Sequence, residues 1–523
     1  MSASHAAPGT VVHGTATGRW VLAATVLGSA MGFLDATVVN VALPAIGSDL
    51  DAGVSALQWV LDGYLLTLAA LILLGGSLAD RYGRRRIFST GVVCFMVPSV
   101  LCALAPDATV LVVARGLQGV GAALLTPGSL AIIQSAFRPD DRARAIGTWS
   151  ALSGVAAALG PILGGYLIDA LSWRWIFLIN VPLGLAVLAA TARHVPESRD
   201  PTVRGRLDLR GGLLATLGLG GLTYALIEGP RGHVATWLVL AVLLLGLAAL
   251  LAFVLTERRS PAPMLPLGVF AARQFLAANA VTVVVYAALG GVFFLLVVFL
   301  QTSLGYSPLL AGAASLPVTL LMLLLSARAG QLAQRVGPRI PLTAGPLLLA
   351  CGMLLMLRID EGDPYVSSVL PAVVVFGLGL ATTVAPVTAT ALAAAPAEHS
   401  GVASGINNAV SRAAQLAAVA ALPPLAGISG GDFTDPGALT DGFHTAMAIT
   451  AALAAAGGVL AFATIRSDVL ARAAAPAGPP EAEKGAAPAA RGAPQKPPYE
   501  CPLAGTPLRP PPRSGGRGGP PGA

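Results

Sequence analysis

The sequence predicts an all-α integral membrane protein whose chain crosses the bilayer fourteen times, and three observations lead to this prediction. First, 55% of the 523 residues are hydrophobic and only 11% are charged, whereas an average soluble domain carries about 25% charged residues. Second, apolar runs recur along nearly the whole chain, and each is about 20 residues or longer, enough to cross the hydrocarbon core of a bilayer. Third, a ten-residue motif occurs twice, in loops predicted to lie on the same side of the membrane.

The apolar runs define the predicted helices in order. The first run, from Trp20 to Ile46, is too long for the apolar region of a signal peptide and lacks a small-residue cleavage site, so it is predicted as helix 1. The fourteen runs lie near residues 19–46, 57–80, 85–105, 108–134, 143–171, 174–193, 208–228, 234–256, 274–302, 308–333, 339–358, 366–395, 400–426 and 443–466. Because the number of spans is even, both termini are predicted on one side of the membrane.

Charged residues in the connections predict which side that is. The connections after helices 2, 4, 6, 8 and 10 carry Arg81, Arg84, Arg85, Arg86, Arg138, Arg142, Arg144, Arg199, Arg204, Arg206, Arg258, Arg259, Arg335 and Arg339. The opposite connections are acidic and hold Asp49, Asp51, Asp107, Asp360, Glu361, Asp363, Asp432 and Asp435, against Arg174, Arg231 and Arg358. The positive-inside rule therefore predicts a multi-pass protein of the cell membrane with both termini in the cytoplasm. This topology also explains the net charge of +7 without a nucleic-acid partner, which would need basic residues gathered in one patch.

An internal repeat divides the chain into parts. The segment Gly76-Ser-Leu-Ala-Asp-Arg-Tyr-Gly-Arg-Arg85, after helix 2, recurs as Gly330-Gln-Leu-Ala-Gln-Arg-Val-Gly-Pro-Arg339, after helix 10. Two copies in the same orientation indicate a parallel repeat of two six-helix bundles, with two extra linker helices between them. The predicted parts are a cytoplasmic N-terminus at 1–18, a first bundle at 19–193, a loop with the extra pair at 194–273, and a second bundle at 274–466. Residues 467–523 are rich in proline, glycine and alanine and are predicted to form a disordered cytoplasmic tail.

Motifs of the first bundle point to a known family. They are Leu34-Asp-Ala-Thr-Val-Val-Asn-Val-Ala-Leu-Pro44, Gln58-Trp-Val-Leu-Asp-Gly-Tyr64, the loop motif above, Arg115-Gly-Leu-Gln-Gly-Val-Gly121, Gly160-Pro-Ile-Leu-Gly-Gly165 and Trp173-Arg-Trp-Ile-Phe-Leu-Ile-Asn-Val-Pro-Leu-Gly184. Together they resemble the fourteen-spanner drug:proton antiporter branch of the major facilitator superfamily. Two positions depart from the family's pattern, since Ala156 replaces a glycine of the helix 5 signature and Gln334 replaces the acid in the second loop copy. The resemblance implies the major facilitator fold and a secondary active transporter that exports small amphipathic or lipophilic compounds, such as drugs and antibiotics, in exchange for protons by alternating access.

An acid and an arginine are the predicted proton-coupling pair. Asp35 in helix 1 and Arg115 in helix 4 have similar predicted depths in the outer half of the membrane, and an ionisable side chain inside a spanning helix usually faces a cavity or a partner. Asp35 can be stabilised as a carboxylate by Arg115 or by a cationic drug, and neutralised by a proton when neither is present. The alternatives are a permanent structural ion pair for Asp35, and bracing of helix 4 against helix 1 for Arg115 with Gln118.

Polar and aromatic residues of helices 2, 4 and 13 are the predicted lining of the substrate cavity. Asp62 follows Trp59 by three positions, so an acid and an aromatic share a helix face that suits a lipophilic cation. An interfacial Trp59 and a solvated Asp62 are the alternative. A polar stripe in helix 13 either lines the pathway or only holds helices together, and it consists of Ser404, Asn408, Ser411 and Gln415 beside Arg412. The cavity candidates are Trp59, Asp62, Tyr64, Gln118, Asn408, Ser411, Arg412 and Gln415.

The loop motif after helix 2 is the predicted cytoplasmic gate. Asp80 could accept hydrogen bonds from a neighbouring helix N-terminus and so lock the inner face, because a helix N-terminus favours negative charge. The alternative is that the arginines of this loop serve only topology. The other gate residues are Gly76, Arg81, Gly83, Arg84 and Arg85.

Helix 5 carries the antiporter signature. Gly160, Gly164 and Gly165 remove side-chain bulk and Pro161 removes a backbone donor, which permits a kink and close helix contact. Packing alone explains this pattern, and a role specific to antiport comes from the resemblance.

Other classes of function lack support in the sequence. The four cysteines are not spaced for a metal site or a disulfide framework, and they are Cys94, Cys102, Cys351 and Cys501. An enzyme or an ATP-driven pump is disfavoured, because the sequence shows no metal-ligand cluster and no phosphate-binding glycine-rich loop with a lysine, and its first lysine is Lys484. The expected partners are a small-molecule substrate, protons and the lipid bilayer, with no cofactor, metal, nucleic acid or obligate protein partner. The alternative function is a dedicated exporter of one endogenous metabolite, such as an antibiotic or a siderophore.

Reporter fusions test the predicted topology. A reporter fused after Arg204 should lie in the cytoplasm, and one fused after Asp363 should lie in the periplasm or outside the cell, because five predicted spans separate the two positions. Alkaline phosphatase, active outside the cytoplasm, and a fluorescent protein, active inside it, measure the two sides independently. The reverse pattern would contradict the topology.

Overall fold

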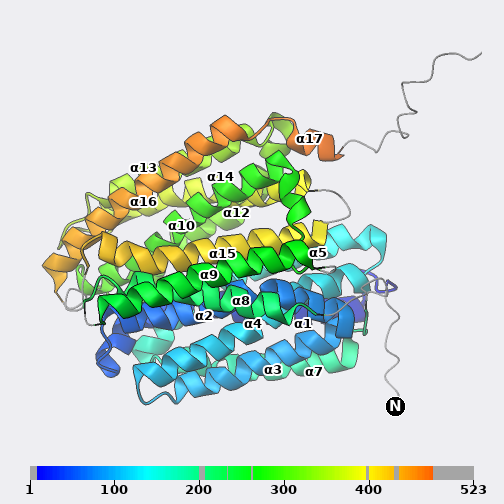
Figure 1. The fold of residues 1–523 in the computed structure, drawn as a ribbon, viewed down its shortest axis with the longest axis horizontal. Helices are drawn as coiled ribbons and strands as arrows, with labels where there is room; N and C mark the ends of the chain where they lie inside the picture. Colours follow the sequence, from blue (N-terminus) through cyan, green and yellow to red (C-terminus); the bar gives the residue numbers. More distant parts are fainter. Residues whose placement is uncertain are drawn as a thin grey trace, which may run out of the picture. The chain divides into compact units, whose positions relative to one another are not determined.

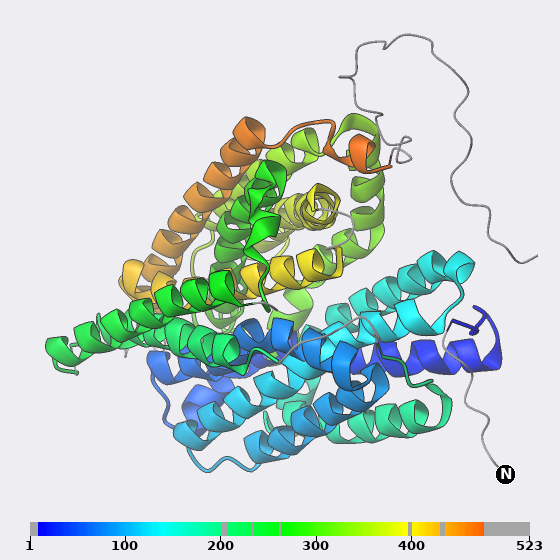
Figure 2. The ribbon, with the colours of Figure 1, turned by 45° about the vertical axis from the view of Figure 1, so that its right-hand side comes forward.

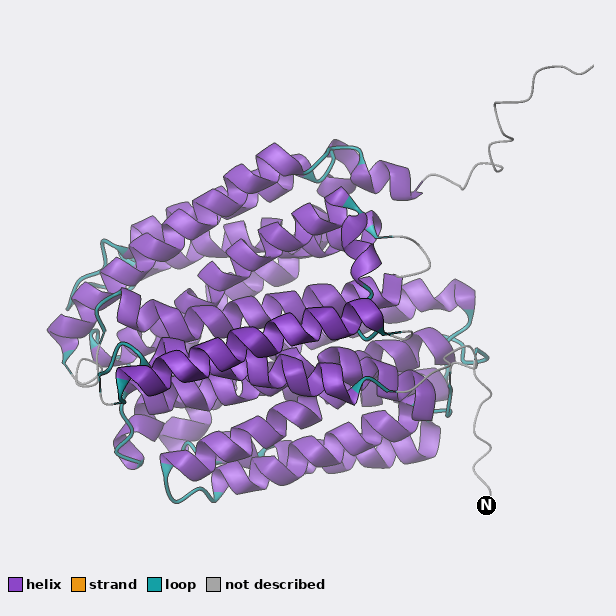
Figure 3. Ribbon diagram, in the orientation of Figure 1, coloured by secondary structure: helices purple, strands orange, loops and turns teal. Residues whose placement is uncertain are grey.

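The protein is helical throughout the part that the structure describes. The computed structural model describes residues 9–199, 207–232, 234–260, 263–395, 400–428 and 435–474, and Figure 3 shows the helices that fill them. In these residues 13 helices are both long and apolar enough to cross a membrane. The remaining span is α15 (Ser400–Leu425), a 26-residue helix whose amides, serines and arginine lower its hydropathy. The predicted fold class, with fourteen spans, is therefore confirmed.

The helices follow the predicted apolar runs. The first six spans are α1 (Ala16–Asp49), α2 (Val54–Tyr82), α3 (Arg84–Ala103), α4 (Ala108–Ala136), α5 (Pro139–Ala170), and α6 (Trp175–Leu178) continued by α7 (Asn180–His194). The extra pair is α8 (Leu209–Glu228) and α9 (Thr236–Arg259), followed by the short 3-10 helix η1 (Leu267–Ala271). The last six are α10 (Arg273–Thr302), α11 (Pro308–Ala314) continued by α12 (Leu316–Val336), α13 (Arg339–Met356), α14 (Val369–Ala394), α15, and α16 (Pro436–Thr464).

Two spans that the sequence predicts as continuous helices are interrupted. The sixth span breaks between α6 and α7 at Ile179, and the tenth breaks between α11 and α12 at Ser315. A proline lies in the first turn after each break, Pro182 in α7 and Pro317 in α12. Because proline has no N–H to donate, it is tolerated in the first turn of a helix and disfavoured further inside.

The two bundles, blue to cyan and green to orange in Figure 2, are built on the same helix pairs. In the first bundle α1 packs against α5 and α7, and α2 packs against α4; in the second, α10 packs against α15 and α16, and α12 packs against α14. The loop motif also occupies equivalent places. Gly83, before α3, has φ 112°, and Gly337, before α13, has φ 85°, a region that favours glycine. Gly83 contacts Glu197, after the last helix of its bundle, and Gly337 likewise contacts Ser467. The sequence repeat is therefore a structural repeat.

The extra pair lies beside the seam between the bundles. Helix α2 of the first bundle packs along α15 of the second, and α8 contacts both of them. Helices α8 and α9 run together across the front of the molecule in Figure 1. The linker helices therefore cover the α2–α15 seam and do not enter either bundle.

The start of α1 and the short helix α17 (Val469–Ala474) lie at the same end of the bundles, which we call the terminal end (Figures 1 and 2). The opposite end is called the far end. Asp468 pairs with Arg466 at 3.1 Å and with Arg472 at 2.7 Å. Residues 467–474 thus form an ordered turn and helix, where the sequence predicts the beginning of a disordered tail. The rest of that predicted tail, 475–523, lies outside the described residues.

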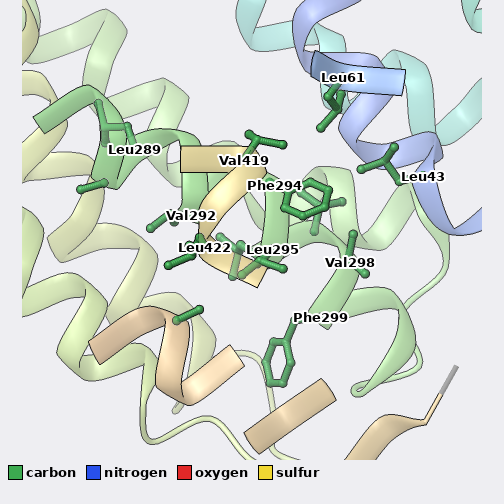
Figure 4. Packing of buried hydrophobic residues seen from close by; sticks show 14 of the residues in the cluster. Leu43, Leu61, Leu289, Val292, Phe294, Leu295, Val298, Phe299, Val419 and Leu422 are labelled. Carbon is green, nitrogen blue, oxygen red and sulfur yellow. The ribbon is translucent and has the colours of Figure 1, made fainter. Parts of the chain in front are cut away.

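The two bundles contact each other at the far end. Gln301 of α10 donates to the Val41 carbonyl of α1 at 2.9 Å, and the Leu309 amide of α11 donates to Asp169 of α5 at 3.1 Å. Apolar side chains of α1 and α2 also approach those of α10 and α15 in one continuous core (Figure 4). Those labelled there include Leu43, Leu61, Phe294, Val298, Val419 and Leu422. The far end is therefore closed.

Candidate functional site: a buried charge network

Five polar side chains from four helices form a buried network in the first bundle. Asp35 on α1 and Arg115 on α4 form an ion pair, with 2.5 Å between Arg115 Nη1 and Asp35 Oδ2. Gln118, one turn along α4, accepts from Arg115 Nη1 at 2.6 Å and donates to Asp35 Oδ1 at 2.8 Å. Gln118 also donates to Ser99 on α3 at 2.9 Å, and Asn180 at the start of α7 lies 3.4 Å from that hydroxyl. All five residues are at most 2% exposed.

Helix α2 completes the surroundings of Arg115. Arg115 Nε donates to the Val60 carbonyl at 3.0 Å, and the guanidinium carbon lies 4.4 Å from the centre of the Tyr64 ring. An aromatic face attracts a cation, by about 2 kcal/mol when both are removed from water. Arg115 Nη2 has no hydrogen-bond partner among the described residues. Asp35 is therefore the counter-ion of a fully buried cation, and loss of such a partner typically costs about 3–5 kcal/mol.

Small residues on α4 bring α2 close enough to take part. A Cβ atom at Gly119 would lie 2.4 Å from the Tyr64 carbonyl, so no other residue fits there without moving α2. Thr67 of α2 donates to the Gly116 carbonyl of α4 at 2.8 Å. The spacing of Gly116 and Gly119 around Gln118 thus places the Tyr64 ring against Arg115.

The structure brings together the pair that the sequence singled out, and adds two residues to it. Asp35, Arg115 and Gln118 contact one another directly, as the similar depths of the first two suggest. Ser99 and Asn180 were not predicted. The amide of Asn180 within an apolar run could have marked it as a site residue. Ser99 could not be recognised in this way, because a serine in a helix commonly bonds to its own backbone, as Ser99 does to the Phe95 carbonyl at 2.8 Å.

Trp59 and Asp62, predicted to share a helix face, have different surroundings. The Trp59 indole donates to Glu228 of α8 at 3.2 Å, and its ring lies 6.5 Å from that of Tyr224. Trp59 therefore contacts the extra pair. Asp62 is completely buried, and neither of its carboxylate oxygens has a hydrogen-bond partner among the described residues. The predicted alternative of a solvated Asp62 is wrong, because Asp62 is fully buried and Gln58, one turn earlier on α2, contacts α15.

The polar stripe of α15 bonds mainly within its own helix. Asn408 is exposed and donates to the Ser404 carbonyl at 3.3 Å, while Ser411 donates to the Asn408 carbonyl at 2.8 Å. The Arg412 guanidinium donates to the side chain of Gln415 at 3.2 Å, and both residues are half-buried. Arg412 also lies within electrostatic range of Tyr64 on α2 and Tyr286 on α10.

Side-chain hydrogen bonds between α15 and α10 come from a residue outside the predicted stripe. Asn407 is buried and donates to Thr282 of α10 at 3.0 Å and to Asn279 at 3.3 Å. Within the stripe, Gln415 also lies against α10, because a Cβ atom at Gly290 would lie 2.9 Å from the Gln415 Cα.

The predicted gate contact of Asp80 is wrong in this conformation. Asp80 accepts from Arg84, four residues on, at 2.8 Å, and this neighbouring guanidinium takes the place of a helix N-terminus. The anion at the N-terminus of α3 is Glu197, whose carboxylate accepts from the Arg85 and Arg86 amides at 3.1 and 3.2 Å. Arg85 also donates to the Val195 carbonyl at 3.2 Å.

Three more gate residues have neighbours in the first bundle. The guanidinium of Arg81 lies 5.7 Å from the ring of Tyr82, and Gly83 makes room for Glu197. A Cβ atom at Gly76 would lie 3.8 Å from Pro127 of α4, an ordinary contact. The loop motif thus holds the α2–α3 turn against the segment after α7.

The glycines of α5 face two different neighbours. Cβ atoms at Gly160 and Gly164 would collide with Thr37 and Val38 of α1, at 2.0 and 2.7 Å. A Cβ atom at Gly165 would lie 2.5 Å from the Pro308 carbonyl of α11, in the second bundle.

The contact between α5 and α11 is reciprocal. A Cβ atom at Gly312 of α11 would lie 2.2 Å from the Pro161 carbonyl of α5. The close packing predicted for the antiporter helix is confirmed, and part of it joins the two bundles.

Fold and site define a class. Two related six-helix bundles with an extra helix pair, closed at one end and holding a charge network in the membrane-spanning region, are the architecture of a secondary transporter. Residues 25–419 match the sequence profile of the Major Facilitator Superfamily. The chain belongs to this superfamily.

Curated relatives of the chain are resistance and export proteins of bacteria. The multidrug resistance protein Stp of Mycobacterium tuberculosis (strain CDC 1551 / Oshkosh) is 41% identical over 74% of this chain and 72% of its own length. The puromycin resistance protein pur8 of Streptomyces alboniger is 37% identical over 86% of this chain and 91% of its own length. The probable actinorhodin transporter of Streptomyces coelicolor (strain ATCC BAA-471 / A3(2) / M145) is 35% identical over 79% of this chain and 74% of its own length.

Solved structures share the fold. A peptide transporter POT in complex with sulfate matches with a TM-score of 0.64 and 18% identity, over 89% of this chain and 97% of that chain. A bacterial homologue of the human lysosomal transporter Spinster, in an inward-facing and unoccupied conformation, matches with a TM-score of 0.61 and 17% identity, over 89% of this chain and 100% of that chain. At these identities the likeness concerns the fold alone.

Substitution of one glycine tests the contact between α5 and α11. Gly165→Val should lower efflux several-fold, because the new side chain forces the bundles apart at the far end and such overpacking costs about 1–3 kcal/mol. Gly154→Val is the matched control on the same helix, since a Cβ atom there meets nothing within 4 Å. Efflux of a fluorescent substrate, normalised to the amount of protein in the membrane, measures both variants. Equal efflux by the two would contradict this role of the contact.

Proposed function

We propose that this protein exports small amphipathic or lipophilic compounds across the cell membrane in exchange for protons, by alternating access. The observation that carries the proposal is the buried network of Asp35, Arg115 and Gln118, in a chain similar to multidrug and antibiotic resistance proteins. A carboxylate buried beside one cation is a group whose protonation changes the charge balance of its whole surroundings.

The coupling follows from the charge count of the network. With Asp35 ionised, the pair with Arg115 is neutral and five residues are held together. With Asp35 protonated, Arg115 becomes an unpaired buried cation, and such a charge is unstable unless water or an anion reaches it. Proton binding thus favours a rearrangement that admits water, and proton release favours the packed state seen here. Substrate export uses this exchange if one conformation binds substrate and the other binds the proton.

The proposed orientation in the membrane determines which side of the transporter is closed in this conformation. With both termini in the cytoplasm, as the positive-inside rule predicts, the closed far end faces the outside of the cell. Two contacts there join the bundles, from Gln301 to Val41 and from Leu309 to Asp169. The pairing of Asp80 with Arg84 then belongs to a state whose cytoplasmic gate is not engaged. When that gate closes, Asp80 is proposed to exchange Arg84 for a partner in the second bundle.

Asp62 is a second ionisable group available to the mechanism. It is buried without a hydrogen-bond partner for either oxygen among the described residues. A proton or a cationic substrate would neutralise it, because an isolated buried carboxylate is strongly destabilised. Arg412 on α15 carries a positive charge of the second bundle toward Tyr64 and Tyr286. The substrate is proposed to bind between α2 and the polar face of α15.

A dedicated exporter of one endogenous metabolite is the second candidate. A specific observation favours it, because one relative at 35% identity is a probable actinorhodin transporter and another is a tetracenomycin C resistance and export protein. Breadth of the substrate range distinguishes the two candidates.

Resistance and efflux in a drug-hypersensitive bacterium test the proposal. Expression should raise resistance to several chemically unrelated compounds, among them puromycin and ethidium, and a protonophore should abolish ethidium efflux, since the proton gradient is the proposed energy source. Efflux that survives the protonophore but stops on depletion of ATP would contradict proton exchange. Resistance confined to one compound would support the dedicated exporter.

A further inference from the structure

Helix α15 has two carbonyl groups that its own backbone cannot bond. In an α-helix each carbonyl accepts from the N–H four residues on. Pro423 and Pro424 lie inside α15 and have no N–H. The carbonyls four residues earlier, those of Val419 and Ala420, therefore lack their helical partners. Both residues are buried, at 3% and 0% exposure, so water does not replace the missing donors.

A single side chain of the other bundle satisfies both carbonyls. Gln58 lies in the first turns of α2, near the far end, and is 3% exposed. Its Nε2 donates to the Val419 carbonyl at 2.8 Å and to the Ala420 carbonyl at 3.2 Å. A side-chain amide nitrogen carries two hydrogens. The two donors of Gln58 thus match the two acceptors that the prolines leave open.

We propose that Gln58 holds the two bundles together at the far end through these two hydrogen bonds, and that Pro423 and Pro424 leave the two carbonyls free to accept them. We call this contact the latch. The inference rests on the proposed alternating access, in which the far end opens and closes. In the closed state the two carbonyls are satisfied by Gln58, and in the open state they are satisfied by water. Gln58 is a positioning residue, which acts on the conformational equilibrium and not on the transported compound.

Substitution at either side of the latch should shift that equilibrium in the same direction. Gln58→Leu leaves two buried carbonyls without donors as long as the far end is closed, and a buried polar group without a partner is unstable. Opening admits water to them. The combined substitution Pro423→Ala and Pro424→Ala restores the two N–H groups, so the carbonyls bond within α15 and the Gln58 amide loses its acceptors. When the far end opens, water can accept hydrogen bonds from the Gln58 amide.

The triple variant distinguishes a latch from general damage. When Gln58→Leu is combined with Pro423→Ala and Pro424→Ala, neither the carbonyls nor the side chain is left unsatisfied in the closed state. The far end should then close again, toward the behaviour of the unsubstituted protein. A merely structural role for each residue predicts the opposite, since the defects of separate sites add.

Spin-label distances across the far end measure the outcome without substrate or a proton gradient. Labels at Leu104→Cys in the first bundle and Val366→Cys in the second lie on exposed positions, 70% and 71%, in a chain whose native cysteines are replaced by alanine. We expect Gln58→Leu to raise the open population several-fold, up to about tenfold, for the loss of two hydrogen bonds. Pro423→Ala with Pro424→Ala should do the same, and the triple variant should revert.

Gln274→Leu is the matched control. Gln274 also donates to a backbone carbonyl, that of Thr464 at 3.0 Å, but within the second bundle and at the terminal end. Its loss should leave the far-end distances unchanged. Unchanged distances in Gln58→Leu, or a triple variant as open as Gln58→Leu, would overturn the latch. If Gln58→Leu does not fold, the double proline variant still decides, because it leaves Gln58 in place. The spin-label distances do not depend on a proton gradient, so the latch can be confirmed even if the proposed exchange of substrate for protons is wrong.

Discussion

A fully buried arginine is the constraint on which the first bundle depends. The Arg115 side chain is fully buried, and helices α1, α2, α3, α4 and α7 supply a carboxylate, a carbonyl, an aromatic face, a hydroxyl and amides to the network around it. Of these groups only Asp35 carries a compensating charge. One proton on that carboxylate therefore changes the stability of a packing arrangement that spans five helices. This is the physical reason why a small ion can drive a large conformational change.

Helix α2 connects that charge network to the contact between the bundles. Along its length it carries Gln58 at the α15 seam, Val60 and Tyr64 at the arginine, and Asp80 at the terminal end. A shift of α2 that follows protonation of the network is thus felt at both ends. Among the described residues, the contacts at the far end that would open and close use glycine surfaces, backbone amides and carbonyls, and one carboxylate that accepts from an amide, with no ion pair between the bundles. Such contacts can break and re-form without a large cost of solvating charge.

The sequence was sufficient for the fold and for the centre of the site. Apolar runs and a repeated loop motif determine the helices and their order, and Asp35 and Arg115 stand out because charges in such runs are costly. Contacts of ordinary residues could not be foreseen. Glu197 takes the place predicted for Asp80, and this depends on how the segment after α7 folds back. Gln58 finds its partners 361 and 362 residues away, and no local pattern reports such a distance.

Proton movement in proteoliposomes tests the central claim, that Asp35 carries the exchanged proton. Ethidium added to vesicles with an imposed pH gradient should evoke proton movement with the unsubstituted protein and with Asp107→Asn, which changes an acid outside the network. Asp35→Glu should retain part of it, since a carboxylate remains. Asp35→Asn, shown by size-exclusion chromatography to be folded, should evoke none, because an amide cannot bind and release the proton. Undiminished proton movement with Asp35→Asn would contradict the account.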